Sequence, residues 1–142
     1  MNILVIDAQG GKLGKQLISA LREAIPDAHI TAVGTNSVAT SNMLRGGADE
    51  AATGENSVVV ASRRADVIVG PIGICIADAM LGEITERMAA AVGRSDAKRV
   101  LIPFNNCDTN VVGVGTQSMG RLVMEAVSAV AQLGKNPIDN SL

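Results

Sequence analysis

The first strand and the turn that follows it constrain this chain more than any other feature. Residues 3–6 are Ile-Leu-Val-Ile, a continuous β-favouring apolar run that is typical of a strand buried on both faces of a parallel sheet. Residues 9–14, Gln-Gly-Gly-Lys-Leu-Gly, form a glycine-rich turn. Apolar residues then recur at helical spacing, at Leu13, Leu17, Ile18, Leu21 and Ile25. A strand, a glycine turn and an amphipathic helix in this order predict the start of a Rossmann-like fold.

The same alternation continues along the chain. We expect further strands at residues 29–33, 48–52, 66–70, 98–103 and 111–114. We expect further helices at residues 35–44, 55–64, 82–92 and 117–133, while residues 71–81 read equally as a loop or a broken helix. Such alternation predicts a doubly wound, mostly parallel α/β sheet with helices on both faces, a three-layer fold. We expect one domain, residues 1–134, followed by a polar tail, residues 135–142.

Composition excludes several classes of function. The chain carries 12 Lys and Arg against 14 Asp and Glu, without the basic stripe that nucleic-acid binding requires. It has no apolar run of about 18 residues, so we expect no membrane span and a cytoplasmic location. Two cysteines do not make a disulfide framework. Cys107 and Asp108 have no histidine near them in sequence, so we expect no metal site.

The glycine turn favours phosphate binding. Glycines after a first strand let backbone N–H groups and the positive end of the next helix approach a phosphate. Against the dinucleotide pattern G-x-G-x-x-G, Gly11 and Gly14 take the second and third places, and Gln9 stands in the first. The alternative is a turn that only packs the helix on the strand. The predicted phosphate-binding residues are Gln9, Gly10, Gly11, Lys12, Leu13 and Gly14.

The end of the second strand bears on which nucleotide would bind. NAD-binding folds often carry an Asp or Glu about 20 residues after the turn, where it binds the ribose hydroxyls. Residues 33–37 are neutral here, so a 2′-phosphate is not repelled and either NAD or NADP is allowed. We expect Thr35 and Asn36 at the ribose, although both also suit a helix N-terminus. We expect Gly70 and Pro71 near the middle of the cofactor.

The segment after the fourth strand is the predicted place for chemistry. The strand order 3-2-1-4-5-6 would open a crevice between strands one and four, with residues 70–73 facing the glycine turn. Asp78 and Glu83 stand among apolar residues, where burial would suit them to acid–base catalysis. The alternative is that both face solvent or favour the start of a helix. Cys75 has no histidine nearby and reads as a small buried side chain rather than a nucleophile.

Two further segments complete the set of candidates. Residues 103–110 gather amides, a carboxylate and a thiol after the fifth strand, as a substrate-contacting loop or an ordinary turn. His29 begins the second strand, at the opposite end of the sheet from the crevice, and reads as a surface residue.

Several motifs together resemble a known family. They are residues 6–11, 34–36, 47–50, 53–56 and 70–73, supported by residues 80–83 and 102–103. They resemble small bacterial proteins, common in anaerobic Firmicutes, that are described only as a domain of unknown function. That resemblance implies no catalytic residue. More loosely, residues 53–55 and 65–70 are similar to NAD(P)-binding Rossmann proteins, although the chain has no Tyr and therefore no Tyr-x-x-x-Lys dyad.

Three functions remain open from the sequence. The first is a small nucleotide-binding protein with NAD(P) as its ligand. The second is a lyase or isomerase of a phosphorylated metabolite, with Asp78 or Glu83 as its base. The third is a non-catalytic metabolite sensor or assembly subunit. Because no second domain would enclose a substrate, we expect a homo-oligomer, to which Met124, Ala129 and Leu133 of the last helix would contribute apolar surface.

Overall fold

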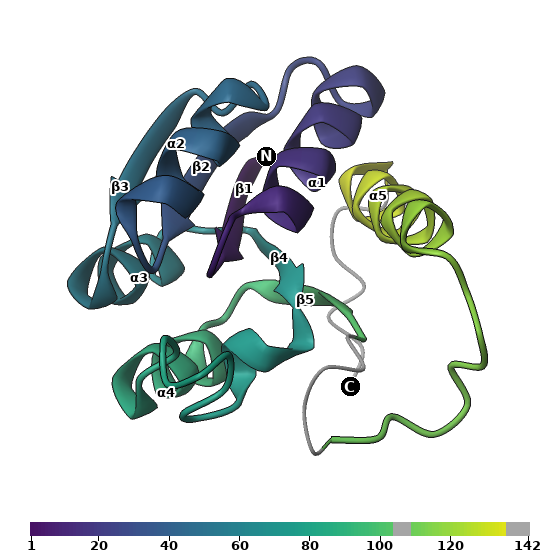
Figure 1. Cartoon of the computed structure of the whole chain (residues 1–142). Helices are drawn as coiled ribbons and strands as arrows, with labels where there is room; N and C mark the ends of the chain where they lie inside the picture. Colours follow the sequence, from purple (N-terminus) through teal and green to yellow (C-terminus); the bar gives the residue numbers. More distant parts are fainter. Residues whose placement is uncertain (104–108, 136–142) are drawn as a thin grey trace.

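A computed structural model describes residues 1–103 and 109–135. Among these residues, five parallel strands form one sheet in the order β3-β2-β1-β4-β5 (Figure 1). The strands are β1 (Asn2–Asp7), β2 (His29–Gly34), β3 (Glu50–Thr53), β4 (Val67–Pro71) and β5 (Lys98–Ile102). The helices are α1 (Lys12–Ala24), α2 (Ser37–Arg45), α3 (Glu55–Ser62), α4 (Glu86–Arg94) and α5 (Met119–Lys135), with a short 3-10 helix η1 (Ile72–Cys75).

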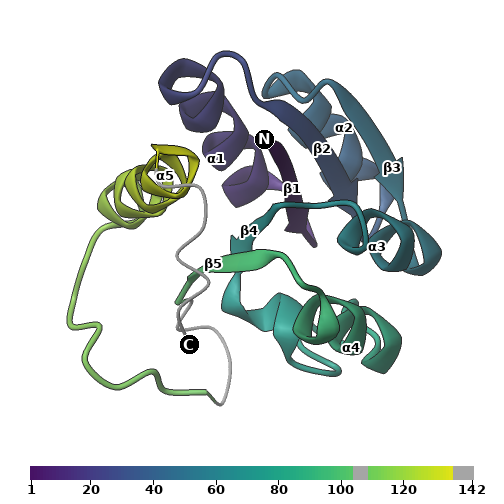
Figure 2. The same ribbon diagram turned by 180° about the vertical axis from the view of Figure 1, so that it is seen from behind.

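The two faces of the sheet carry separate hydrophobic cores. Alternate residues of β1 supply them: Ile3 and Val5 pack with α1, α2 and α5, whereas Leu4 and Ile6 pack with α3 and α4. The two views in Figures 1 and 2 show helices on both sides of the strands. Successive side chains of a strand point to opposite faces, so a continuous apolar run fits only a strand covered on both. The three-layer, doubly wound α/β fold expected from the sequence is confirmed.

The prediction of a strand at residues 111–114 is wrong. This segment forms a turn, and the described part of the sheet ends at β5. Gly113 and Gly115 both have positive φ values, and the side chain of Val112 is 93% exposed. Glycine within a short apolar run weakens a strand, so the apolar composition of this segment was misleading.

Other helices and loops differ in their bounds from those expected from the sequence. Residues 71–81 form η1 and then a series of turns. The next helix, expected from residue 82, begins at Glu86 because the side chain of Thr85 caps it by accepting a hydrogen bond from the N–H of Met88. The last helix runs to Lys135, and residues 104–108 and 136–142, with Cys107 and Asp108 among them, lie outside the described residues. None of the described helices is long and apolar enough to cross a membrane.

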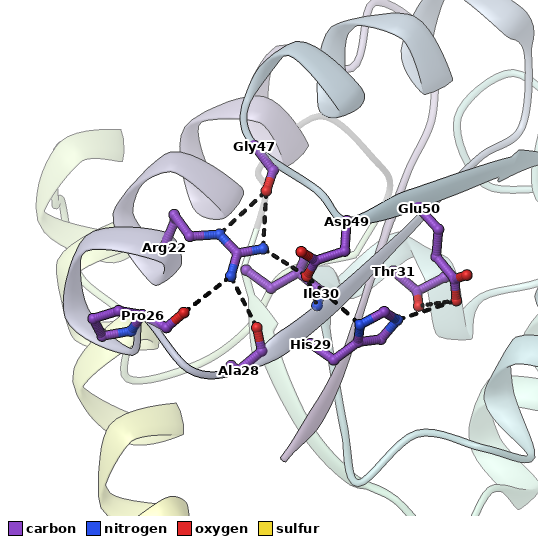
Figure 3. A network of polar contacts seen from close by, with 9 residues as sticks. All are labelled: Arg22, Pro26, Ala28, His29, Ile30, Thr31, Gly47, Asp49 and Glu50. Atoms are coloured by element: carbon purple, nitrogen blue, oxygen red, sulfur yellow. Dashed lines mark hydrogen bonds and ion pairs between the residues drawn. The ribbon is translucent and has the colours of Figure 1, made fainter.

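Arg22 links the segments that lie at the amino-terminal ends of β2 and β3 (Figure 3). Its guanidinium donates hydrogen bonds to the carbonyl oxygens of Pro26, Ala28 and Gly47, and at 2.7 Å to Oδ2 of Asp49. The same oxygen of Asp49 accepts from the N–H of Ile30, and these contacts hold the pKa of Asp49 below its ordinary value. This network ties the end of α1 to β2 and to the start of β3.

His29 lies beside this network and is exposed, as expected from the sequence. Its ring contacts Oε1 of Glu50 at 3.3 Å (Figure 3). The turns described next lie at the opposite end of the sheet, after the carboxyl ends of the strands.

Candidate functional site

The turn after β1 places three N–H groups at the mouth of a crevice. Gly11 has φ of 69°, and a Cβ at this position would lie 2.6 Å from the Cα of Ala39, so only glycine fits. Lys12 and Leu13 begin α1, where backbone N–H groups have no partner within the helix. Among the described residues, the N–H groups of Gly10, Lys12 and Leu13 have no hydrogen-bond acceptor.

Gly14 serves packing rather than ligand contact. A Cβ there would lie 2.5 Å from Sδ of Met43 and 2.9 Å from Cβ of Asp7. Gly14 therefore lets α1 approach both β1 and α2 closely, which is the role of the third glycine in dinucleotide-binding turns. Gly70 is similar: a Cβ on it would collide with the carbonyl oxygen of Ile6 on β1.

Asp7 is the residue that the sequence analysis missed. It ends β1 and is only 5% exposed. Its Oδ1 accepts from the N–H of Ala8 at 2.8 Å, and its Oδ2 accepts from the N–H of Gly14 at 2.7 Å. Burial raises the pKa of Asp7, and the negative charge of Glu83 adds to the rise, while the two N–H groups oppose it. The available signal was an acidic residue at the end of a buried strand, directly before a glycine turn.

A pocket of about 260 Å³ opens between the turns after β1 and β4. Its walls are residues 7–13 and 71–73, with Ile76, Met80, Leu81 and Thr109. The structure therefore brings together six of the predicted cofactor-binding residues, namely Gln9, Gly10, Gly11, Lys12, Leu13 and Pro71. Gly14, Thr35, Asn36 and Gly70 do not line it. The pocket lies where the strand order reverses, between β1 and β4, the usual ligand position in open α/β sheets.

Glu83 fills the space at the ends of β1 and β2. Its Oε1 accepts hydrogen bonds from Oγ1 of Thr35 at 2.9 Å and from Nδ2 of Asn36 at 2.7 Å. Its Oε2 accepts from the N–H of Gln9 at 3.0 Å. A carboxylate therefore does lie at the end of β2, although it comes from the segment after β4.

Asn36 supports both the turn and the helix beside it. Its Nδ2 also donates to the carbonyl oxygen of Gln9 at 2.9 Å, and its Oδ1 accepts from the N–H of Ala39, which caps α2. The helix-capping alternative considered for this residue is therefore what the structure shows.

The segment that carries Glu83 has an unusual backbone. Asp78, Met80 and Leu81 have φ values of 65°, 55° and 58°, a region that residues other than glycine rarely adopt. Each such residue costs on the order of 1–3 kcal/mol, and this kind of strain clusters at ligand sites and switch regions. The side chain of Leu81 is 96% exposed at the pocket mouth, whereas Ile84 is fully buried and anchors the segment.

Asp78 and Cys75 make no contribution to the pocket wall. The side chain of Asp78 is exposed, and its backbone N–H donates to the carbonyl oxygen of Ile84. Burial raises the pKa of Cys75, which disfavours the reactive thiolate. The roles predicted for Asp78 and Glu83 in catalysis stay predictions, and Glu83 alone of the two contacts the turn after β1.

Fold and site together define a doubly wound α/β protein with a pocket at the switch between β1 and β4. The chain belongs to the family described as "Domain of unknown function (DUF3842)", whose model matches residues 2–135. The resemblance to an uncharacterised family seen in the sequence is thereby confirmed. No curated protein sequence matches the chain.

Three solved structures are similar to it in fold. A dodecameric FMN-dependent UbiX-like decarboxylase from Escherichia coli O157:H7 matches with a TM-score of 0.49 at 21% identity, over 91% of this chain and 75% of that one. AibC matches with a TM-score of 0.49 at 16% identity, over 94% and 39%. A family 9 glycosyl transferase from Veillonella parvula DSM 2008 matches with a TM-score of 0.50 at 16% identity, over 99% and 43%. This chain thus spans less than half the length of the last two.

Proposed function

We propose that this protein binds a small phosphorylated ligand in the pocket between the turns after β1 and β4. The observation that carries the proposal is a set of three N–H groups, on Gly10, Lys12 and Leu13, which have no acceptor among residues 1–103 and 109–135 and belong to residues that line the pocket. They lie at the amino end of the 13-residue helix α1, whose dipole favours negative charge at that end.

The charges around the pocket suit a phosphate group whose binding depends on the protonation of Asp7. Lys12 is exposed beside the unpaired N–H groups and supplies a positive charge. Asp7 lies at the base of the same pocket, and its pKa is already raised by burial. A bound phosphate raises that pKa further because two negative charges close together repel. We therefore expect phosphate to bind less tightly as pH rises through the pKa of Asp7.

The volume of the pocket limits the size of the ligand. At about 260 Å³ it falls just below the range of roughly 300–1,000 Å³ that is usual for pockets holding drug-sized ligands. A mononucleotide or a smaller phosphorylated metabolite suits this volume better than an entire dinucleotide. The apolar side chains of Ile72, Ile76 and Met80 would contact the less polar part of such a ligand.

Binding of NAD or NADP stays a prediction, and it requires a change in the structure. In a dinucleotide complex, Thr35 and Asn36 would contact the ribose, but both donate to Glu83 here. Glu83 would have to move before the second half of a dinucleotide could bind beside β2.

A reaction on the bound ligand would use Asp7. It is the buried carboxylate of the pocket, and a raised pKa suits a group that gives or takes a proton near neutral pH. This supports the lyase or isomerase alternative.

The sensor alternative and the homo-oligomer stay predictions. Met124 of α5, which was expected to contribute apolar surface to a subunit contact, is 62% exposed. Native mass spectrometry would measure the number of subunits and any ligand retained on purification.

The experiment that tests the binding proposal is a thermal-shift panel on the purified chain, with inorganic phosphate, AMP, FMN, NADH and NADPH. We expect phosphate and the mononucleotides to raise Tm. Lys12→Glu should reduce these shifts. Lys15→Glu is the matched control, since Lys15 is exposed on the same helix but does not line the pocket. No shift with phosphate or with either mononucleotide would overturn the proposal, and shifts with the dinucleotides alone would favour NAD(P).

A further inference from the structure

The contacts of Glu83 define a second binding place next to the pocket. Three donors converge on its carboxylate: the N–H of Gln9, the hydroxyl of Thr35 and the side-chain amide of Asn36. We call these three groups the anion cradle. They lie at 2.7–3.0 Å from the carboxylate oxygens, within the normal range for hydrogen bonds in proteins. The cradle is therefore seen binding an anionic group, which the chain itself supplies.

The donors of the cradle do not depend on Glu83 for their positions. Asn36 is fixed by capping α2 through Oδ1 and by donating to the carbonyl oxygen of Gln9. Thr35 directly follows β2, and its own N–H donates to the carbonyl oxygen of Asp7. The cradle is thus built by the ends of β1 and β2, while the carboxylate arrives from a different loop.

That loop is strained. Three residues that are not glycine, Asp78, Met80 and Leu81, hold positive φ values within four positions, immediately before Glu83. The strain is offset by the contacts of the segment, which include the hydrogen bonds of Glu83 and the burial of Ile84. Release of Glu83 from the cradle would remove three of the hydrogen bonds that offset this strain, while the backbone hydrogen bond from Asp78 to Ile84 would still hold the base of the segment.

We propose that the cradle is an anion-binding subsite that Glu83 occupies in this structure, and that an acidic group of a ligand replaces Glu83 there. This rests on the proposed function for the identity of the whole ligand, because Gln9 belongs to both the cradle and the pocket wall. The ligand would carry a phosphate at α1 and a second acidic group, a phosphate or a carboxylate, at the cradle.

Chemical rescue tests the subsite without knowledge of that ligand. Glu83→Ala empties the cradle, and acetate supplies the missing carboxylate. We expect acetate to raise the Tm of Glu83→Ala in a saturable way, by roughly 4–7 °C at ten times its dissociation constant. Phosphate should compete with acetate in this variant. Sodium chloride at the same ionic strength should have no such effect.

Four controls make the result specific to the cradle. Wild type and Glu23→Ala, an exposed glutamate of α1, should show only the small non-specific effect of acetate. Glu83→Gln should resist rescue because its amide still fills the cradle. Thr35→Val combined with Glu83→Ala should lose most of the saturable shift, since one donor is gone.

Absence of a saturable acetate shift in Glu83→Ala, or an equal shift in Glu23→Ala, would overturn the subsite. If Glu83→Ala does not fold in chloride, its refolding yield in acetate replaces Tm as the readout, and an unchanged yield has the same meaning. Lys12→Glu separates the two proposals: it should weaken phosphate binding in wild type and leave acetate rescue of Glu83→Ala intact.

Discussion

Asp7 and Gly14 are joined by a hydrogen bond of 2.7 Å, from the backbone N–H of Gly14 to Oδ2 of Asp7. Gly14 is the third residue of α1, so its N–H has no partner within the helix, and Gly11 at the cap position has no side chain to supply one. The last residue of β1 therefore caps the helix and also lies at the base of the pocket. Helix stability and the charge of the pocket depend on the same carboxylate.

The raised pKa of Asp7 makes its contribution to stability fall with pH. Between the ordinary value of 3.8 and its raised value, the folded chain holds a proton that the unfolded chain has lost, so stability decreases as pH rises through this interval. Asn at this position does not titrate. We expect wild type to lose free energy of unfolding relative to Asp7→Asn as pH rises above 3.8, measured by urea denaturation. A gain of wild type relative to Asp7→Asn over the same pH range would contradict the raised pKa of Asp7.

Replacement by alanine should destabilise the chain at only one of two glycines of the turn. At Gly14 a Cβ would overlap Met43 and Asp7, and forcing an extra methyl into such a site costs about 1–3 kcal/mol. At Gly10 a Cβ would meet nothing within 4 Å, and φ is not positive. We expect Gly14→Ala to lower the free energy of unfolding by that amount and Gly10→Ala to leave it within about 0.5 kcal/mol. Equal losses in urea denaturation would show that the close packing of α1 has been misread.

Arg22 should not be replaceable by lysine. Its planar guanidinium donates to three carbonyl oxygens and to Asp49 at once, and an ammonium group cannot reproduce that geometry. We expect Arg22→Lys to lose about 1–3 kcal/mol of stability and to leave ligand-induced Tm shifts unchanged, because it lies at the opposite edge of the sheet. Arg121→Lys, whose exposed pair with Glu125 is worth little, is the control. A loss of ligand shift in Arg22→Lys would mean that the two edges are coupled.

The strain at Leu81 predicts a stabilising substitution. Its side chain is exposed and its φ of 58° suits glycine, so Leu81→Gly should raise the free energy of unfolding by about 0.5–1 kcal/mol. The same change at Leu44, an exposed residue of α2, should lower it by about 1 kcal/mol. Thermal and urea denaturation measure both. Destabilisation by Leu81→Gly would show that its exposed side chain contributes contacts that outweigh the strain.

Much of the site could be located from the sequence, but its internal contacts could not. Residues 9–13 of the turn and the segment after β4 do form walls of the pocket. Asp7 was overlooked because the local pattern shows an acidic residue at the end of a buried strand but does not show that its carboxylate will be buried. The neutral end of β2 was read as lacking an acid, whereas Glu83 reaches Thr35 and Asn36 from more than 45 residues away in the chain.

What the sequence determined by itself is the doubly wound α/β fold. Continuous apolar runs and apolar stripes of period 3.6 are local signals, and the burial of β1 on both faces and of one face of α1 follows from them directly. The tertiary structure alone decided the end of the sheet at β5 among the described residues, the burial of Asp7 and the contact between Glu83 and the turns after β1 and β2. These depend on which loops meet at the carboxyl edge of the sheet, and that is set by strand order and packing between segments distant in sequence.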